Sequence, residues 1–184
     1  PDFGFLLASM IVPSGGSLAR ADLLQPRVEP EIAFWLNADL RGPGVTRGQV
    51  LAATRGVSAA LEIVDSRIAN WKIKLADTIA DNGSSARAVI SERLVLVSDL
   101  DLAAEAVHLF RNDVEVGTGT GADVLGHPAE AVAWLANRLA DFGDALQAGD
   151  VVLPGAMCAS VFGQSGEMFR ADFTLLGSVS VAFV

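Results

Sequence analysis

The sequence predicts an α+β fold dominated by a mixed β-sheet with a small number of covering helices. Three segments carry the strand pattern: an apolar alternation over residues 25–37, a run of small and β-branched residues over 57–65, and a β-rich final stretch over 148–184. Two further segments have helix-start signals, at Thr46 and at Pro128. Strands at both ends of the chain with helices between them are typical of an α+β domain.

Length, composition and charge limit the class of protein. A chain of 184 residues that is 51% hydrophobic can bury a sizeable core, and we expect residues 1–184 to form one domain. With 13 basic and 22 acidic residues the net charge is −9, which argues against nucleic acid and anionic membranes as partners. The single cysteine allows no intrachain disulfide and fits the reducing cytoplasm.

The longest uncharged run, residues 3–19, does not have the features of a membrane segment. Pro13, Gly15 and Gly16 interrupt it, so it is too broken to span a bilayer as a helix. It also lacks the basic flank of a signal peptide. We therefore expect no membrane association.

Residues 25–37, QPRVEPEIAFWLN, form the element around which the chain is organised. In a strand, residues two apart project from one face, so Glu29 and Glu31 would point into one space. Val28, Ile32 and Phe34 would fill the opposite face. An edge strand with one solvated face would produce the same alternation. Two adjacent buried carboxylates, however, would call for a compensating cation.

A third carboxylate favours the cation. After a predicted helix from Thr46 to about Arg55, the strand over residues 57–65 carries Glu62, which would be costly to bury alone. Three carboxylates suit Mg²⁺ or Mn²⁺, which prefer oxygen ligands. The two histidines and the cysteine have no zinc-site spacing.

The middle of the chain supplies a polar turn, a hairpin and a helix. Residues 77–85, DTIADNGSS, predict a turn that presents amides and hydroxyls. Residues 103–110 and 114–118 predict two strands joined at Asn112 and Asp113, and residues 128–142 a helix ended by Gly143. Before them, Asp65 and Arg67 could form an ion pair that orients the strand bearing Glu62.

Three other features carry no chemistry in this interpretation. The Gly-Thr alternation over residues 117–121 lacks the spacing and lysine of a phosphate loop, which excludes a nucleotide site. His127 is interpreted as a helix-entry residue, and Cys158 as a packing residue because no base stands near it in the sequence. In the final stretch, strands are expected over residues 151–156, 168–173 and 178–184, and the Pro154-Gly155 turn would bring backbone close to a ligand.

Several segments in order resemble a known family. PDFGFLLASM, QPRVEPEIAFWL, ALEIVDSRIANWKI, DTIADNGSS, GADVLGHPAEAVAWLANRLA, LQAGDVVLPGA and LGSVSVAF are similar to the 2-keto-4-pentenoate hydratase and 4-oxalocrotonate decarboxylase branch of the fumarylacetoacetate hydrolase superfamily. The ordered set of glutamate strand, ALEIVDSR and DTIADN is the most specific part. The resemblance refines the fold to the rolled β-sandwich of that superfamily.

The resemblance also implies roles for individual residues. It assigns the metal ligands to Glu29, Glu31 and Glu62, and an acid/base role to Asp2 of the PDFG motif. Asn82 and Ser84 are predicted to bind the substrate carboxylate, although a plain Asx-turn that caps the next element is an alternative. Related hydratases carry a lysine in a segment before PDFG. That segment is missing from this sequence, so we expect the chain to be a fragment.

The implied activity is metal-dependent addition of water to a 2-hydroxy-2,4-dienoate, giving a 4-hydroxy-2-oxo acid in the meta-cleavage degradation of aromatic compounds. Decarboxylation of 4-oxalocrotonate is the second hypothesis and hydrolysis of an acylpyruvate the third. A truncated metal-binding domain without turnover is the alternative from another class. The expected partners are the small dienoate acid, further copies of the chain in a homo-oligomer, and a partner enzyme of the same pathway.

Overall fold

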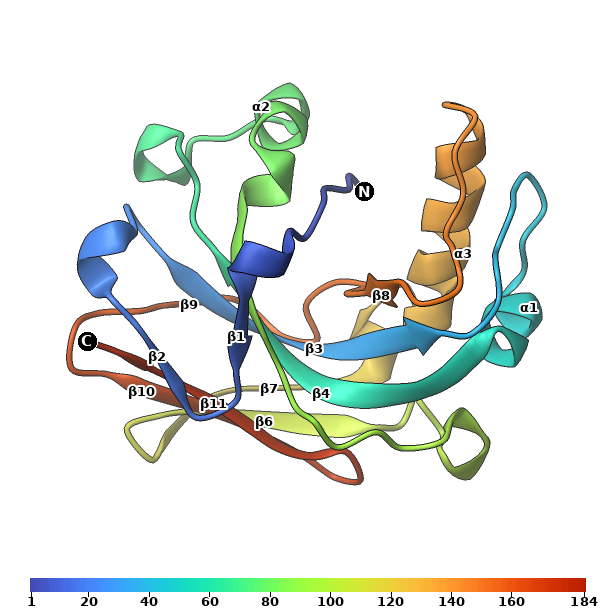
Figure 1. Cartoon of the computed structure of the whole chain (residues 1–184). Helices are drawn as coiled ribbons and strands as arrows, with labels where there is room; N and C mark the ends of the chain where they lie inside the picture. Colours follow the sequence, from blue (N-terminus) through green and yellow to red (C-terminus); the bar gives the residue numbers. More distant parts are fainter.

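The computed structural model describes all 184 residues and contains two β-sheets that lie against each other (Figure 1). The first sheet has the order β1-β5-β4-β3-β8, and β9 also pairs with β3. Its strands are β1 (Ile11–Pro13), β3 (Arg27–Leu36), β4 (Thr54–Val64), β5 (Ser85–Ile90), β8 (Val151–Val152) and β9 (Val161–Phe162). The β1-β5 pair is parallel and the other pairs are antiparallel, so the sheet is mixed, as predicted.

The second sheet has the order β2-β11-β10-β6-β7. Its strands are β2 (Gly16–Leu18), β6 (Ala106–Arg111), β7 (Val114–Thr120), β10 (Met168–Phe173) and β11 (Gly177–Phe183). The predicted hairpin is confirmed: β6 and β7 are joined by Asn112 and Asp113, both with positive φ. The Gly-Thr alternation in β7 serves close packing, because a Cβ at Gly119 would lie 1.8 Å from the Met157 carbonyl oxygen.

Alternation along β3 decides which face of the first sheet meets the second. Val28, Ile32 and Phe34 are fully buried in the core cluster, together with Phe169 and Val181 of the second sheet. The odd-numbered side of β3 faces the opposite way, toward the helices. The prediction of an apolar face and a carboxylate face on one strand is therefore confirmed.

Three helices accompany the sheets: α1 (Arg47–Ala52), α2 (Leu75–Ala80) and α3 (Pro128–Ala140). In Figure 1, α2 and α3 stand on the side of the first sheet that faces away from the second, and the N-terminal segment runs between them. The α+β prediction is thus confirmed. The helices also place the N-terminal residues over the carboxylate face of β3.

Several predicted boundaries were wrong for identifiable reasons. The helix from Thr46 ends at Ala52 rather than near Arg55, because β4 already begins at Thr54, which pairs with β3. The predicted strand over 103–110 begins only at Ala106, since the preceding residues form a turn capped by the Asp101 carboxylate. The turn predicted over residues 77–85 begins only at Asp81, because helix α2 extends to Ala80; just before that helix, the Asp77 carboxylate accepts from the Lys74 backbone N–H.

No helix of the structure is both long enough and apolar enough to cross a lipid bilayer.

Candidate metal centre

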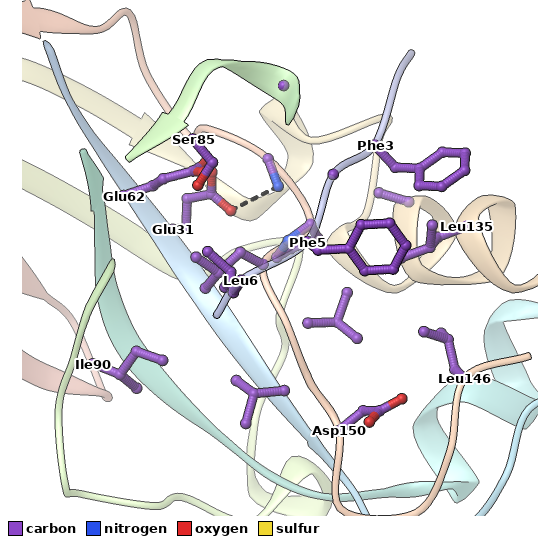
Figure 2. Close-up of a pocket in the computed structure, with 18 of the residues that line it drawn as sticks. Phe3, Phe5, Leu6, Glu31, Glu62, Ser85, Ile90, Leu135, Leu146 and Asp150 are labelled. Atoms are coloured by element: carbon purple, nitrogen blue, oxygen red, sulfur yellow. Dashed lines mark hydrogen bonds between the residues drawn. The ribbon is translucent and has the colours of Figure 1, made fainter. Parts of the chain in front are cut away.

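Three glutamate side chains meet on the helix-facing side of the first sheet. Glu29 and Glu31 are two apart on β3 and therefore share a face, and Glu62 of β4 lies directly opposite Glu29 in the antiparallel register. One carboxylate oxygen from each of the three lies within 4.8 Å of the others. The structure therefore brings together the three residues that the sequence singled out. Figure 2 shows Glu31 and Glu62 side by side.

Burial and mutual repulsion make this cluster costly without a cation. Burial, with the charge of Glu62 second, raises the pKa of Glu29 to about 7. Burial and the charges of Glu62 and Glu29 raise the pKa of Glu31 well above its ordinary value. Burial likewise raises the pKa of Glu62. A divalent cation would remove this cost, and a donor set of carboxylate oxygens suits Mg²⁺ or Mn²⁺. The residues present fit such an ion.

A backbone group from a distant part of the chain fixes the central carboxylate. The Gly155 N–H donates to Glu31 Oε2 over 2.8 Å. Gly155 has φ +123°, a conformation that favours glycine and that follows the short strand β8. The strand predicted over 151–156 therefore ends at Val152. The prediction that the Pro154-Gly155 turn brings backbone to the site agrees with this contact.

The carboxylates lie in a pocket of about 1450 Å³. Figure 2 shows Glu31 and Glu62 at one end of the pocket, and mainly apolar side chains from the N-terminal segment, α3 and the loop before β8, together with Asp150, toward the other end. These apolar residues include Phe3, Phe5, Leu6, Leu135 and Leu146. Such a pocket suits a small acid whose charged head reaches the carboxylate cluster through a cation and whose carbon chain contacts the apolar wall.

Asp2 lines the same pocket and is held by helix α2. The Thr78 hydroxyl donates to Asp2 Oδ2 over 2.7 Å, which fixes the orientation of the carboxylate. Burial is the main cause of the raised pKa of Glu62, and the negative charge of Asp2 also raises it. The two carboxylates therefore repel each other across the pocket. The sequence identified Asp2 but not Thr78, whose role depends on a contact between residues 76 positions apart.

Asn82 lines the pocket and Ser84 lies next to it, but both side chains are hydrogen-bonded within the protein. The Asn82 amide makes two hydrogen bonds with the main chain of Phe5, and the Ser84 hydroxyl donates to Asp81 over 2.9 Å. Ser84 is almost fully buried, whereas the next residue, Ser85, lines the pocket. The Ser85 hydroxyl is buried without a hydrogen-bond partner and lies beside Glu62 (Figure 2). The substrate-binding roles of Asn82 and Ser84 stay predictions.

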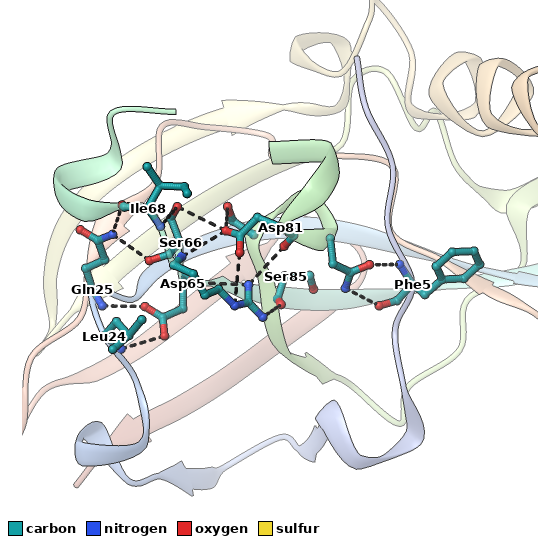
Figure 3. Close-up of polar contacts among 11 residues, drawn as sticks. Phe5, Leu24, Gln25, Asp65, Ser66, Ile68, Asp81 and Ser85 are labelled. Carbon is teal, nitrogen blue, oxygen red and sulfur yellow. Dashed lines mark hydrogen bonds and ion pairs between the residues drawn. The ribbon is translucent and has the colours of Figure 1, made fainter. Parts of the chain in front are cut away.

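The predicted Asp65–Arg67 ion pair was wrong. The Asp65 carboxylate accepts from the backbone N–H groups of Leu24 and Gln25 over 2.8 and 2.6 Å, and so holds the start of β3 (Figure 3). Arg67 instead pairs with Asp81 over 3.4 Å. The unpaired backbone of the chain before β3 competes better for the Asp65 oxygens, because a buried N–H without an acceptor is costly.

The histidines and the cysteine take the structural places expected of them. His127 Nδ1 accepts from the Ala129 N–H over 3.1 Å, which confirms that it caps α3. His108 is exposed and pairs with Glu115, and neither histidine lines the pocket. Burial raises the pKa of the Cys158 thiol to about 11, so it is not an activated nucleophile.

Comparisons with known proteins show the family of the chain. Residues 1–184 match the family described as fumarylacetoacetate (FAA) hydrolase C-terminal. A 2-hydroxyhexa-2,4-dienoate hydratase from Comamonas testosteroni is 50% identical over all of this chain and 70% of its own length. A 4-oxalocrotonate decarboxylase from Pseudomonas sp. (strain CF600) is 41% identical, with the same coverage.

Solved structures point the same way. The 4-oxalocrotonate decarboxylase from Pseudomonas putida G7, complexed with magnesium and adipate, superposes with a TM-score of 0.96 at 38% identity. The match covers 98% of this chain and 69% of that one. A divalent cation is therefore present in a protein of the same fold and related sequence. The chain belongs to the fumarylacetoacetate hydrolase family.

Proposed function

We propose that this chain is the metal-binding catalytic domain of a hydratase that adds water to a 2-hydroxy-2,4-dienoate. One observation carries the proposal: one buried and two partly buried carboxylates from adjacent strands converge at one end of a pocket whose remaining wall is largely apolar. The names of relatives at 44 to 50% identity, which are dienoate and pentenoate hydratases, support the substrate class. The product would be a 4-hydroxy-2-oxo acid.

In this proposal Glu29, Glu31 and Glu62 hold Mg²⁺ or Mn²⁺. When bound, the ion supplies positive charge that attracts the substrate carboxylate and polarises the neighbouring oxygen. The Gly155 N–H keeps the Glu31 carboxylate in place. Asp2, whose carboxylate accepts from Thr78, would accept and return the proton as the dienol ketonises and water adds to the far carbon. The apolar wall would contact the carbon chain of the substrate.

The test is turnover of 2-hydroxypenta-2,4-dienoate by the 184-residue chain with Mg²⁺ or Mn²⁺. We expect loss of the dienol absorbance and formation of 4-hydroxy-2-oxopentanoate, both abolished by EDTA and by Glu62→Gln. Glu105→Gln is the control, because Glu105 is a buried glutamate outside the pocket. Metal binding without turnover would favour a catalytically incomplete domain. Absence of metal binding would overturn the proposal.

Decarboxylation of 4-oxalocrotonate is the second candidate. The decarboxylase relative at 41% identity and the decarboxylase structure with a TM-score of 0.96 favour it. The same pocket and cation would serve both reactions, since each needs negative charge stabilised on the substrate oxygens. Incubation with 4-oxalocrotonate and measurement of released CO₂ separates the two: a decarboxylase releases CO₂ and forms no hydrated product from the pentadienoate.

Two further parts of the proposal concern the setting of the enzyme. The single cysteine supports the cytoplasm as its location. Exposed apolar side chains in the N-terminal segment, Phe5 and Leu7, support a homo-oligomer in which a neighbouring surface covers them. Sedimentation of the purified chain tests the second point, and a monomer at micromolar concentration would contradict it.

A further inference from the structure

The N-terminal segment from Asp2 to Leu7, here called the strap, crosses the pocket and is tied to the protein on both sides. On one side the Thr78 hydroxyl of α2 holds Asp2. On the other side Phe3 packs edge-to-face against Trp134 of α3, at a centroid distance of 6.3 Å. Figure 2 shows Phe3 and Phe5 above the pocket, near Leu135 of α3. The strap therefore forms one wall of the site that contains Asp2.

A single side-chain amide fixes the middle of the strap. The Phe5 N–H donates to Asn82 Oδ1 over 2.8 Å, and Asn82 Nδ2 donates to the Phe5 carbonyl oxygen over 3.0 Å (Figure 3). This reciprocal pair has the pattern of two strands exchanging hydrogen bonds, with an amide side chain in place of one strand. It occupies the Asn82 carbonyl oxygen and one of its N–H donors.

Close packing reinforces the amide contact. A Cβ on Gly4 would lie 2.5 Å from the Asn82 backbone oxygen and 2.6 Å from its Oδ1. Only glycine lets the strap approach the turn this closely. Asn82 itself has φ 58°, a left-handed conformation that asparagine tolerates better than most residues.

The turn that carries Asn82 is itself rigidly held. The Asp81 carboxylate accepts from the Ser84 hydroxyl and from the Arg67 backbone N–H. The Arg67 guanidinium in turn donates to the backbone carbonyls of Asp81 and Ser85 over 3.2 Å each (Figure 3). Ser85 lies beside Glu62 in the carboxylate cluster. The same turn thus borders the carboxylate cluster at Ser85 and holds the strap at Asn82.

We infer that Asn82 is a positioning residue: its amide clamps the Phe5 main chain and so holds Asp2 at the working distance from the carboxylate cluster. This inference rests on the proposed function for the role of Asp2, but the clamp itself does not. In this inference the Asn82 side chain holds the main chain of Phe5 and does not bind the substrate carboxylate. Loss of the clamp frees the strap while leaving the metal ligands in place.

Hydrogen exchange of the strap, with kinetics and ligand binding, tests the inference. In Asn82→Ala we expect amide exchange at Phe5 to rise about tenfold or more, because its acceptor is lost. We expect kcat to fall about tenfold, with KM, Mn²⁺ affinity and the affinity of the Mn²⁺-loaded chain for oxalate within about twofold of wild type. Asn82→Asp keeps the acceptor for the Phe5 N–H and should fall between wild type and Asn82→Ala in kcat.

Two further variants keep the result interpretable. Gly4→Ala should reproduce the faster exchange and lower kcat without altering Asn82, because the added methyl group pushes the strap away. Asn112→Ala is the matched control: Asn112 also has positive φ and accepts a backbone N–H, from Met168, but lies on the β6–β7 hairpin outside the pocket. It should leave exchange of the strap and kcat unchanged.

The outcomes that would overturn the inference are distinct. Unchanged exchange at Phe5 in Asn82→Ala would show that no clamp exists. Faster exchange with unchanged kcat would show that the clamp does not position Asp2 for reaction. Oxalate binding lost in Asn82→Ala but retained in Gly4→Ala would show that Asn82 binds the ligand directly. If wild type has no turnover, the proposed function fails by itself, and the exchange measurements still test the clamp.

Discussion

Two buried glutamates in this chain, one in each half of the sandwich, have opposite environments. Glu31 and Glu105 are 1% and 2% exposed. Glu105 Oε1 accepts from the backbone N–H groups of Leu175 and Leu176 over 2.8 and 3.2 Å, and so ties the β10–β11 turn to the start of β6. Glu31 has one backbone donor, Gly155, and two other carboxylates within 4.8 Å.

The difference separates a carboxylate held by the fold from one that we propose as a metal ligand. The Glu105 environment supplies hydrogen-bond donors that match its negative charge, so it needs no ligand. The Glu31 environment supplies more negative charge than donors, so it favours an added cation or, without one, protonation of the carboxylates. Burial alone therefore does not identify a candidate metal ligand. A buried carboxylate becomes a candidate when other carboxylates near it outnumber its hydrogen-bond donors.

The largest expected effect is on metal binding. Glu31→Gln should weaken Mn²⁺ binding by about 100-fold or more, because a direct ligand matters at least as much as the groups that orient ligands. Isothermal titration calorimetry measures the affinity. Glu105→Gln should bind Mn²⁺ within about twofold of wild type. Equal losses in the two variants would remove the distinction between them.

The next effect, on folding, should run in the opposite direction. Glu105→Ala leaves two buried N–H groups without an acceptor and should lower the free energy of unfolding by about 3 kcal/mol. In EDTA, Glu31→Gln should lower the free energy of unfolding by less than about 1 kcal/mol or raise it, since it removes a repelling charge. Urea denaturation measures both. Glu105→Gln, which keeps an acceptor oxygen, should lie close to wild type. A strongly destabilised Glu31→Gln in EDTA would contradict this.

The sequence pointed to the clustered glutamates and overlooked Glu105 for the same reason. Glu29 and Glu31 share a face because of strand periodicity, which is a local property. The apolar residues Val28 and Ile32 on the opposite face allowed this periodicity to be recognised in the sequence. Nothing next to Glu105 in the sequence marks it as buried, because its donors are 70 and 71 residues away. Local patterns predict which face a side chain takes, and they do not predict its partners.

The same limit explains the rest of the site. The strand pattern pointed to Glu62 and the family resemblance to Asp2. Their placement depends on the register of β3 with β4 and on Thr78, which no spacing encodes. The Gly155 contact with Glu31 joins residues 124 positions apart. The predicted turn over residues 77–85 was in the right place, yet the target of the Asn82 amide could be seen only once the strap was located.

The last prediction concerns pH and uses Glu29, the third member of the cluster. Burial raises its pKa from 4.5 to about 7, so between these values the folded, metal-free protein binds a proton that the unfolded chain has released. Its contribution to stability is complete below pH 4.5 and is lost as pH rises through 7. Between pH 4.5 and 8 in EDTA, the free energy of unfolding of wild type should therefore fall by up to about 3 kcal/mol more than that of Glu29→Gln. Urea denaturation at the two pH values measures the difference, and Glu105→Gln should behave as wild type. If Glu29→Gln loses as much stability as wild type, the carboxylate cluster is not desolvated, and the contrast between the two halves of the sandwich fails.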